Sequence, residues 1–186
     1  MKALEDLEAW YRECPGALVA FSGGVDSSLV AFLSRHFLGN DQVLAVISAS
    51  PSLKLCDLEE ARHFAGGIDL PLKVIATQEM ENPNYYENPA NRCYFCKHSL
   101  YDALVGLAED YPDWWILNGT NSEDALDYRP GLKAAEAFWV RSPLVDCEVD
   151  KQAVRALAKR FNLVCWDKPA SPCLSSRVPY GERNHS

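Results

Sequence analysis

The chain has 186 residues, of which 48% are hydrophobic and 24% charged, and its formal net charge is -8. This length predicts a single domain over residues 1–186, and scattered Lys and Arg in an acidic chain argue against a nucleic-acid partner. No apolar run reaches the roughly 20 residues of a membrane helix, and the start MKALEDLEAWYREC lacks the apolar segment of a signal peptide. We therefore expect a cytoplasmic protein with no membrane partner.

The predicted elements alternate between helix and strand along the chain. Helical spacing of apolar residues predicts a helix over 2–13, and the same pattern with stop signals predicts helices at 29–38, 57–65, 94–108 and after Asp150. Short apolar runs predict strands at 17–21, 43–47, 72–76, 114–117 and 163–166, with a long loop at 78–92 and a loop-rich stretch at 118–147. This alternation predicts an α/β fold: a doubly wound parallel sheet with helices on both faces, whose ligands bind at the carboxyl ends of the strands.

A glycine- and serine-rich heptad follows the first predicted strand: Ser22, Gly23, Gly24, Val25, Asp26, Ser27 and Ser28. The glycines allow a sharp turn and a close ligand approach, and the helix behind them begins with N–H groups that have no helical partner. These donors and the three hydroxyls favour an anion. Asp26 beside a phosphate requires a cation, so it is a candidate Mg²⁺ ligand. The heptad is neither a Walker A loop nor G-x-G-x-x-G, and the alternative is an ordinary turn before a helix.

Other segments supply further candidate ligands. Cys93 and Cys96 form a CxxC pair, which is compatible with half a zinc site, a redox pair or two buried thiols. A zinc site would need further ligands, and His98 and Cys56 are available but lie in no recognisable zinc spacing. The remaining cysteines have apolar neighbours and are predicted core thiols: Cys14, Cys56, Cys147 and Cys165.

Polar residues after the fourth predicted strand are candidates for the same ligand. Gly119 and Thr120 can approach a nucleotide closely, and Asp124 is a second candidate Mg²⁺ ligand. Arg129 and Arg177 are candidate clamps for a phosphate or carboxylate, with a structural salt bridge as the alternative.

The heptad resembles the PP-loop of the N-type ATP pyrophosphatases, which cleave ATP between the α and β phosphates. From about Phe21 to Gly181 the chain resembles the LarE family of ATP-dependent sulfur transferases. The motifs that carry this resemblance are RCYFCK, NGTN, DYRPG, SPL and WDKPASPCLSSRVPYG, at 92–97, 118–121, 127–131, 142–144 and 166–181. The resemblance implies ATP and Mg²⁺ as cofactors and a small carboxylate, a pyridinium dicarboxylate mononucleotide, as substrate. The carboxylate is adenylated and then receives sulfur, which gives a thiocarboxylate precursor of the nickel-pincer nucleotide.

The resemblance also assigns roles to residues. It implies that residues 22–28, Gly119, Thr120 and Asp124 bind ATP, that Arg129, Ser176 and Arg177 bind substrate, and that Asp26, Cys173 and Arg177 are catalytic. Some family members sacrifice the sulfur of one cysteine, whereas others carry three cysteines suited to a 4Fe-4S cluster with one open iron. Cys93, Cys96 and Cys173 match the second type, and Pro172 stands at the sacrificial position.

Two departures from the family pattern raise alternatives. Asn118 stands where the family usually has Asp, and the family continues well beyond Gly181, whereas this chain ends at Ser186. We therefore expect a truncated protein, a split enzyme whose partner chain supplies the C-terminal region, or a degenerate relative. The alternative functions are another PP-loop enzyme, such as a tRNA thiolase, an amidating synthetase or the queuosine-precursor enzyme, and an ATP-binding module that needs a partner.

Overall fold

The computed structural model describes residues 2–50, 53–77, 91–126 and 130–169. Its strands are β1 (Ala17–Ala20), β2 (Val43–Ser48), β3 (Leu72–Ile75) and β4 (Trp115–Leu117). Its longer helices are α1 (Lys2–Tyr11), α2 (Val25–Leu38), α3 (Leu55–Gly67), α5 (Arg92–Ala108) and α9 (Lys151–Arg160). Shorter helices are η1 (Asn40–Gln42), α6 (Ser122–Leu126), α7 (Pro130–Ala137) and α8 (Pro143–Asp146).

The four strands form one parallel sheet in the order β3-β2-β1-β4. Ala17 of β1 pairs with Val43 of β2 on one side and with Trp115 of β4 on the other. All four residues of β1 are buried, as expected for a central strand that is covered on both faces. The chain moves outward from β1 to β3 and then returns to the other side of β1, so the strand order reverses between β1 and β4.

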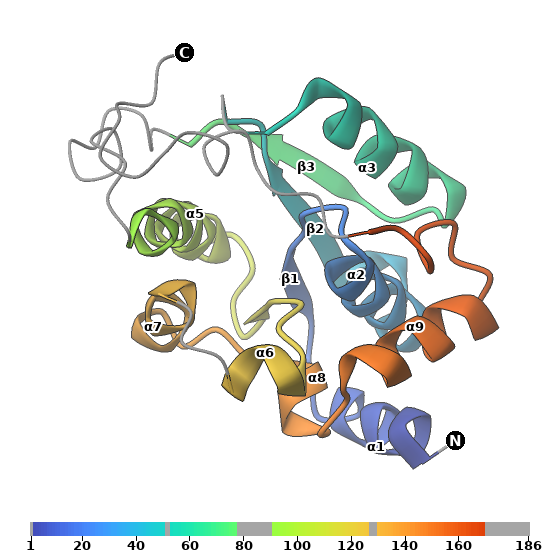
Figure 1. The fold of residues 1–186 in the computed structure, drawn as a ribbon. Coiled ribbons are helices and arrows are strands. Elements are labelled where there is room, and N and C mark those ends of the chain that lie inside the picture. Colours follow the sequence, from blue (N-terminus) through green and yellow to red (C-terminus); the bar gives the residue numbers. More distant parts are fainter. Residues whose placement is uncertain (1, 51–52, 78–90, 127–129, 170–186) are drawn as a thin grey trace.

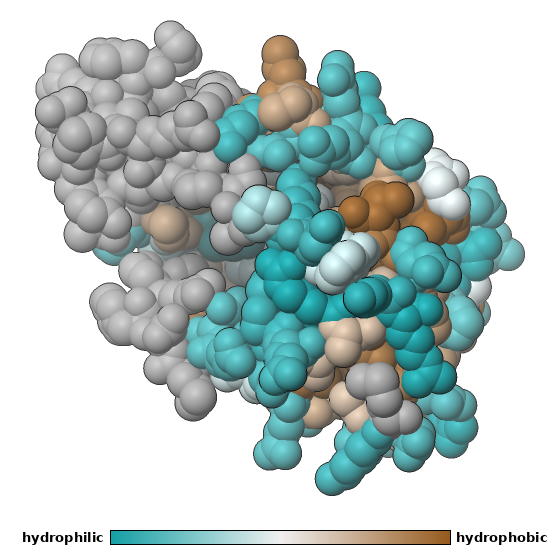
Figure 2. Space-filling view, turned by 45° about the vertical axis from the view of Figure 1, so that its right-hand side comes forward, coloured by the Kyte–Doolittle hydropathy of each residue, from teal (hydrophilic) through white to brown (hydrophobic). Residues whose placement is uncertain are grey.

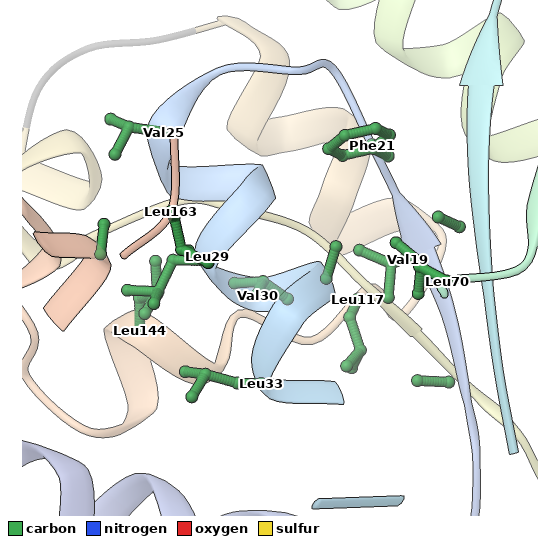
Figure 3. Packing of buried hydrophobic residues seen from close by; sticks show 14 of the residues in the cluster. Val19, Phe21, Val25, Leu29, Val30, Leu33, Leu70, Leu117, Leu144 and Leu163 are labelled. Atoms are coloured by element: carbon green, nitrogen blue, oxygen red, sulfur yellow. The ribbon is translucent and has the colours of Figure 1, made fainter. Parts of the chain in front are cut away.

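Helices cover both faces of the sheet (Figure 1). Ala17 and Val19 contribute to a core with α1, α2, α3 and α9, whereas Leu18 and Ala20 contribute to a second core with α5 and α7. This alternation follows from the two-residue period of a strand. Figure 3 shows Leu29, Val30 and Leu33 of α2 in the first core, among leucines of other elements. The predicted doubly wound α/β fold is therefore confirmed.

Two local features explain how the first strand and the last helix begin. A Cβ on Gly16 would lie 2.4 Å from the Trp114 ring, so only glycine allows this indole to cover the start of β1. At α9 the predicted cap is confirmed, because the Asp150 carboxylate accepts a hydrogen bond from the Ala153 N–H at 2.7 Å.

The structure corrects two expectations about the C-terminal half. Residues 163–166 form turns and not a strand, since Trp166 N–H donates to the Leu163 carbonyl at 3.1 Å instead of joining the sheet. Residues 118–147 are not mainly loop, because the described part contains α6, α7 and α8. These helices have four to eight residues each, which is too short for a clear helical period. Most of the predicted loop at 78–92 lies outside the described residues.

The surface in Figure 2 is mainly hydrophilic, with smaller groups of hydrophobic side chains between the charged ones. None of the described helices is long and apolar enough to cross a membrane.

Candidate functional site

The heptad at 22–28, called the phosphate loop below, connects β1 to α2 and forms the first turn of α2, as predicted. Gly23 has a φ of +73°, a conformation that favours glycine. The Ser27 hydroxyl donates to the Gly24 carbonyl at 3.1 Å and accepts the Ser22 N–H at 3.2 Å. The first hydrogen bond of α2 joins Ser28 N–H to the Gly24 carbonyl at 2.9 Å, so the amides of residues 25–27 precede the helical ladder. Such amides are the donors with which a helix N-terminus binds an anion.

The turn after β4 packs directly on this loop. A Cβ on Gly119 would lie 2.5 Å from the backbone nitrogen of Ser27, so the backbones are as close as the absence of a side chain permits. The buried Asn118 holds this turn, because its Oδ1 accepts the Thr120 N–H at 3.0 Å and the Ser142 hydroxyl at 2.7 Å. Its amide nitrogen donates to the Tyr101 hydroxyl at 3.4 Å. Asn118 thus orients the turn, and Gly119 meets the phosphate loop.

A polar cluster connects the phosphate loop to α6 and α9. The Asn121 Nδ2 donates to Asp26 Oδ1 and to Asp124 Oδ2, both at 3.0 Å. The second Asp26 oxygen pairs with the Lys151 ammonium at the first residue of α9. Sequence reasoning identified both carboxylates but missed Asn121 and Lys151. No local signal marks Lys151, since it lies 125 positions from Asp26 along the chain.

Residues of the phosphate loop, the turn after β4 and Asp124 of α6 line a cavity of about 400 Å³ between the ends of β1 and β4. This is the position where the strand order reverses, and ligands of open α/β sheets bind there. The predicted site residues that line it are Ser22, Gly24, Asp26, Ser27, Cys93, Gly119, Thr120 and Asp124. Lys97, which the sequence analysis quoted within a motif but gave no role, and Tyr101 of α5 also line it. The structure therefore brings most of the predicted nucleotide site together.

A second cavity lies on the α3 side of the phosphate loop. Gly23 and Ser28 line it together with α3 and residues 164–169, and its volume is about 760 Å³. This cavity is larger, but the hydroxyls of Ser22 and Ser27 and the carboxylates of Asp26 and Asp124 line the first cavity and not this one.

The wall of the second cavity is tied to α3. The Lys168 ammonium lies 2.6 Å from Glu60 and 3.3 Å from Asp57, and Arg155 donates to the Trp166 and Lys168 carbonyls at 2.8 and 3.0 Å. Burial alone would lower the pKa of Lys168, but the Glu60 and Asp57 carboxylates raise it above the ordinary value. Residues 163–169 therefore pack beside the phosphate loop although they form no strand.

The carboxylates provide hard oxygen ligands of the type that Mg²⁺ prefers. Asp26 Oδ1 and Asp124 Oδ2 share one hydrogen-bond donor, so both oxygens lie around the same small volume. In the described part of the chain, no three His, Cys, Asp or Glu side chains form a metal-ligand group. Mg²⁺ usually binds through one or two carboxylates and completes its shell with substrate phosphates and water.

The cysteines fall into two environments. Cys93 is exposed and Cys96 half-buried in the first turn of α5. Cys14 and Cys165 are buried, and burial raises the pKa of both thiols, to about 11 for Cys14. Burial also raises the pKa of the half-buried Cys147 to about 11. The prediction of a core thiol is wrong for Cys56, which is exposed on α3 because its position is on the solvent side of that helix.

Several predicted residues lie outside the described part of the chain: Arg129, Pro172, Cys173, Ser176 and Arg177. Their assigned roles stay predictions.

Comparison with known proteins agrees with this geometry. The NAD synthase family matches residues 9–88, which include the phosphate loop. A Synechocystis sp. protein of uncharacterized function is 46% identical over 96% of this chain and 66% of its own length. The pyridinium-3,5-bisthiocarboxylic acid mononucleotide synthase of Lactiplantibacillus plantarum is 34% identical over 94% of this chain and 63% of its own length. The chain is similar to the LarE-type PP-loop proteins over nearly its whole length.

This similarity confirms the family resemblance that the motifs carry. The chain spans slightly less than two thirds of the length of both relatives. Its fold is shared more widely: a glutamine-dependent NAD⁺ synthetase from Acinetobacter baumannii, solved with ADP, superposes with a TM-score of 0.67 at 18% identity. That comparison covers 89% of this chain and 34% of the synthetase.

Proposed function

We propose that the chain binds MgATP in the 400 Å³ cavity and adenylates a substrate carboxylate as the first half of an ATP-dependent sulfur transfer. One observation carries this proposal: the N-terminal amides of α2 and the carboxylates of Asp26 and Asp124 meet at the same cavity. The amides suit the pyrophosphate end of ATP, and the carboxylates suit its divalent cation.

The chemistry follows from charge development on the leaving group. A carboxylate oxygen attacks the α-phosphorus of ATP, the bond to the bridging oxygen breaks, and pyrophosphate leaves with the electron pair. Negative charge accumulates on the pyrophosphate, where the α2 amides and the hydroxyls of Ser22 and Ser27 stabilise it. A sulfur nucleophile then attacks the carbonyl carbon of the mixed anhydride and AMP leaves, which gives a thiocarboxylate.

The substrate that we propose is a pyridinium dicarboxylate mononucleotide, so that the product is a precursor of the nickel-pincer nucleotide. The support for it is the 34% identity to a synthase of pyridinium-3,5-bisthiocarboxylic acid mononucleotide. The cytoplasm is the location that we propose for this reaction.

The sulfur source that we propose involves the cysteines. Cys93 and Cys96 are separated by three positions on α5, so they share a helix face, and Cys93 lines the cavity. Cys93 and Cys96 would supply two thiolates of the proposed 4Fe-4S cluster, and Cys173 would supply the third. Such a cluster, when bound, supplies an iron that can carry sulfide.

A second candidate is amidation, in which ammonia replaces the sulfur nucleophile. The match of the NAD synthase family to residues 9–88 favours it. Both reactions share the adenylate, so only the second nucleophile distinguishes them.

The test is release of pyrophosphate from MgATP with pyridinium-3,5-dicarboxylic acid mononucleotide as acceptor. We expect pyrophosphate and an acyl adenylate, which releases AMP only when a sulfur nucleophile or water attacks it. Asp26→Ala should lower the rate at least about 100-fold, as for removal of a group that stabilises developing charge. Asp41→Ala, at an exposed position in η1, is the matched control. Release of orthophosphate alone would contradict the proposal. ATP binding without turnover would instead indicate a module that needs a partner chain.

A parallel reaction with sulfide or ammonium, followed by mass spectrometry, separates the two candidates. Sulfide should yield the thiocarboxylate. An amide that forms preferentially with ammonium would favour the second candidate.

A further inference from the structure

Lys151 is the first residue of α9, and its ammonium pairs with Asp26 Oδ2. A cation at this position is unfavourable for the helix itself, because the positive end of the helix dipole lies there. The Asp26 carboxylate offsets this cost. The pair is sheltered, with side-chain exposures of 35% for Lys151 and 19% for Asp26.

The ion pair is not needed to dock α9 on α2. The contact between these helices is already apolar: Val154, Leu157 and Ala158 are buried in the same core as Leu29 and Leu33. The Phe32 and Phe161 rings add a contact at 4.8 Å between centroids. We therefore expect Lys151 to act on Asp26 and not on the packing of α9.

The charges of the cluster point to that role. Asp26 and Asp124 each carry one negative charge, and the Asn121 amide between them carries none. Lys151 lowers the net charge of the three ionised groups from minus two to minus one before any nucleotide binds. Without Lys151, two carboxylates at the mouth of the phosphate loop would repel the polyphosphate of ATP.

We propose that Lys151 is the positioning residue and resident counter-ion of Asp26, which keeps the site receptive to a nucleotide before the divalent cation arrives. Its ammonium holds Oδ2, so that Oδ1 faces Asn121 and Asp124, where the cation binds. This inference rests on the proposed binding of MgATP but not on turnover.

The proposal predicts opposite effects on two ligands. Lys151→Met removes a positive charge close to the cation site, so binding of Mn²⁺ alone should strengthen about fivefold to tenfold. ATP in the presence of EDTA should bind about tenfold more weakly, because the carboxylates are no longer neutralised. A lysine with a merely structural role would move both affinities in the same direction or neither.

The experiment measures Mn²⁺ binding by electron paramagnetic resonance and metal-free ATP binding by calorimetry, on the full chain at low ionic strength. Lys151→Arg keeps the charge and should retain both wild-type affinities within about threefold. Lys159→Met is the matched control, since it removes the same charge from the exposed end of α9, where Lys159 lies 4.6 Å from the Trp166 ring centre. It should change neither affinity.

Three results would overturn the proposal. They are weaker or unchanged Mn²⁺ binding in Lys151→Met, the same changes in Lys159→Met, and no Mn²⁺ binding in either wild type or Lys151→Met. If Lys151→Met does not fold, the Lys151→Gln variant, which retains a polar side chain, must show stronger Mn²⁺ binding and weaker metal-free ATP binding. Failure of pyrophosphate release with every carboxylate would overturn the proposed function and leave these binding results in place.

Discussion

A Cβ on residue 119 would lie 2.5 Å from the Ser27 nitrogen and 2.7 Å from the Ser27 Cα. The turn after β4 and the first turn of α2 are therefore in backbone contact, although 92 positions separate them. The nucleotide cavity lies at this junction. Its shape depends on a glycine that touches the phosphate loop as well as on the glycines inside the loop.

Gly119→Ala tests this junction. Gly119 does not have a positive φ, so the effect is steric: the methyl group meets backbone atoms that cannot rotate away, and it crowds an amide of the anion site. We expect a loss of about 1–3 kcal/mol in unfolding free energy and ATP affinity at least about tenfold lower. Urea unfolding and calorimetry measure the two effects.

The matched control is Gly106→Ala in α5, where nothing lies within 4 Å of the added Cβ. It should stabilise the protein by about 0.5–1 kcal/mol through helix propensity and leave ATP binding unchanged. Equal behaviour of the two alanine variants would contradict the steric argument.

Asn118→Leu should destabilise the protein by about 2–4 kcal/mol. It removes the oxygen that accepts the Thr120 N–H and the Ser142 hydroxyl in a buried position. Asn118→Asp keeps an acceptor for both donors, and the Tyr101 hydroxyl can donate to its second oxygen, so ATP binding should persist. Urea unfolding and ATP titration compare the variants. An Asp variant as damaged as the Leu variant would argue that the amide N–H, and not the oxygen, holds the turn.

MgATP should protect Cys93 from alkylation. Cys93 is exposed and lines the cavity, whereas the exposed Cys56 lies on α3 and lines neither cavity. We expect iodoacetamide to modify Cys93 at least about fivefold more slowly with saturating MgATP, and Cys56 at an unchanged rate, with peptide mass spectrometry as the readout. Equal protection of both thiols would indicate a general change in structure and not occupancy of the cavity.

Stability should fall at alkaline pH through the buried thiols. Burial raises the pKa of Cys14 from 9.0 to about 11, so the folded state retains a proton that the unfolded state loses. The stabilisation that the protonated Cys14 thiol contributes is fully present below pH 9 and is lost as the pH rises toward 11. Near pH 10 the free energy of unfolding should be about 1 kcal/mol lower because of Cys14. Urea unfolding at pH 8 and pH 10 measures this change, and Cys14→Ala should reduce the difference between the two pH values.

The sequence by itself determined the α/β architecture and the family resemblance. Strand burial and helix starts follow from local patterns, so β1 to β4 and the main helices were predictable within a few residues. The prediction from sequence patterns was wrong at 163–166, where an apolar run forms turns beside the phosphate loop. It also missed the short helices α6, α7 and α8. In both regions tertiary contacts, and not local periodicity, select the backbone conformation.

The sequence also indicated candidate residues for ATP binding, because the heptad encodes a helix N-terminus whose first amides precede the helical hydrogen bonds. Only the tertiary structure decided how that loop is completed. Asn121 and Lys151 reach Asp26 from distant parts of the chain, and the Gly119 turn contacts Ser27. Such partners are set by how strands and helices meet at the edge of the sheet. The local sequence around Lys151 does not predict its contact with Asp26.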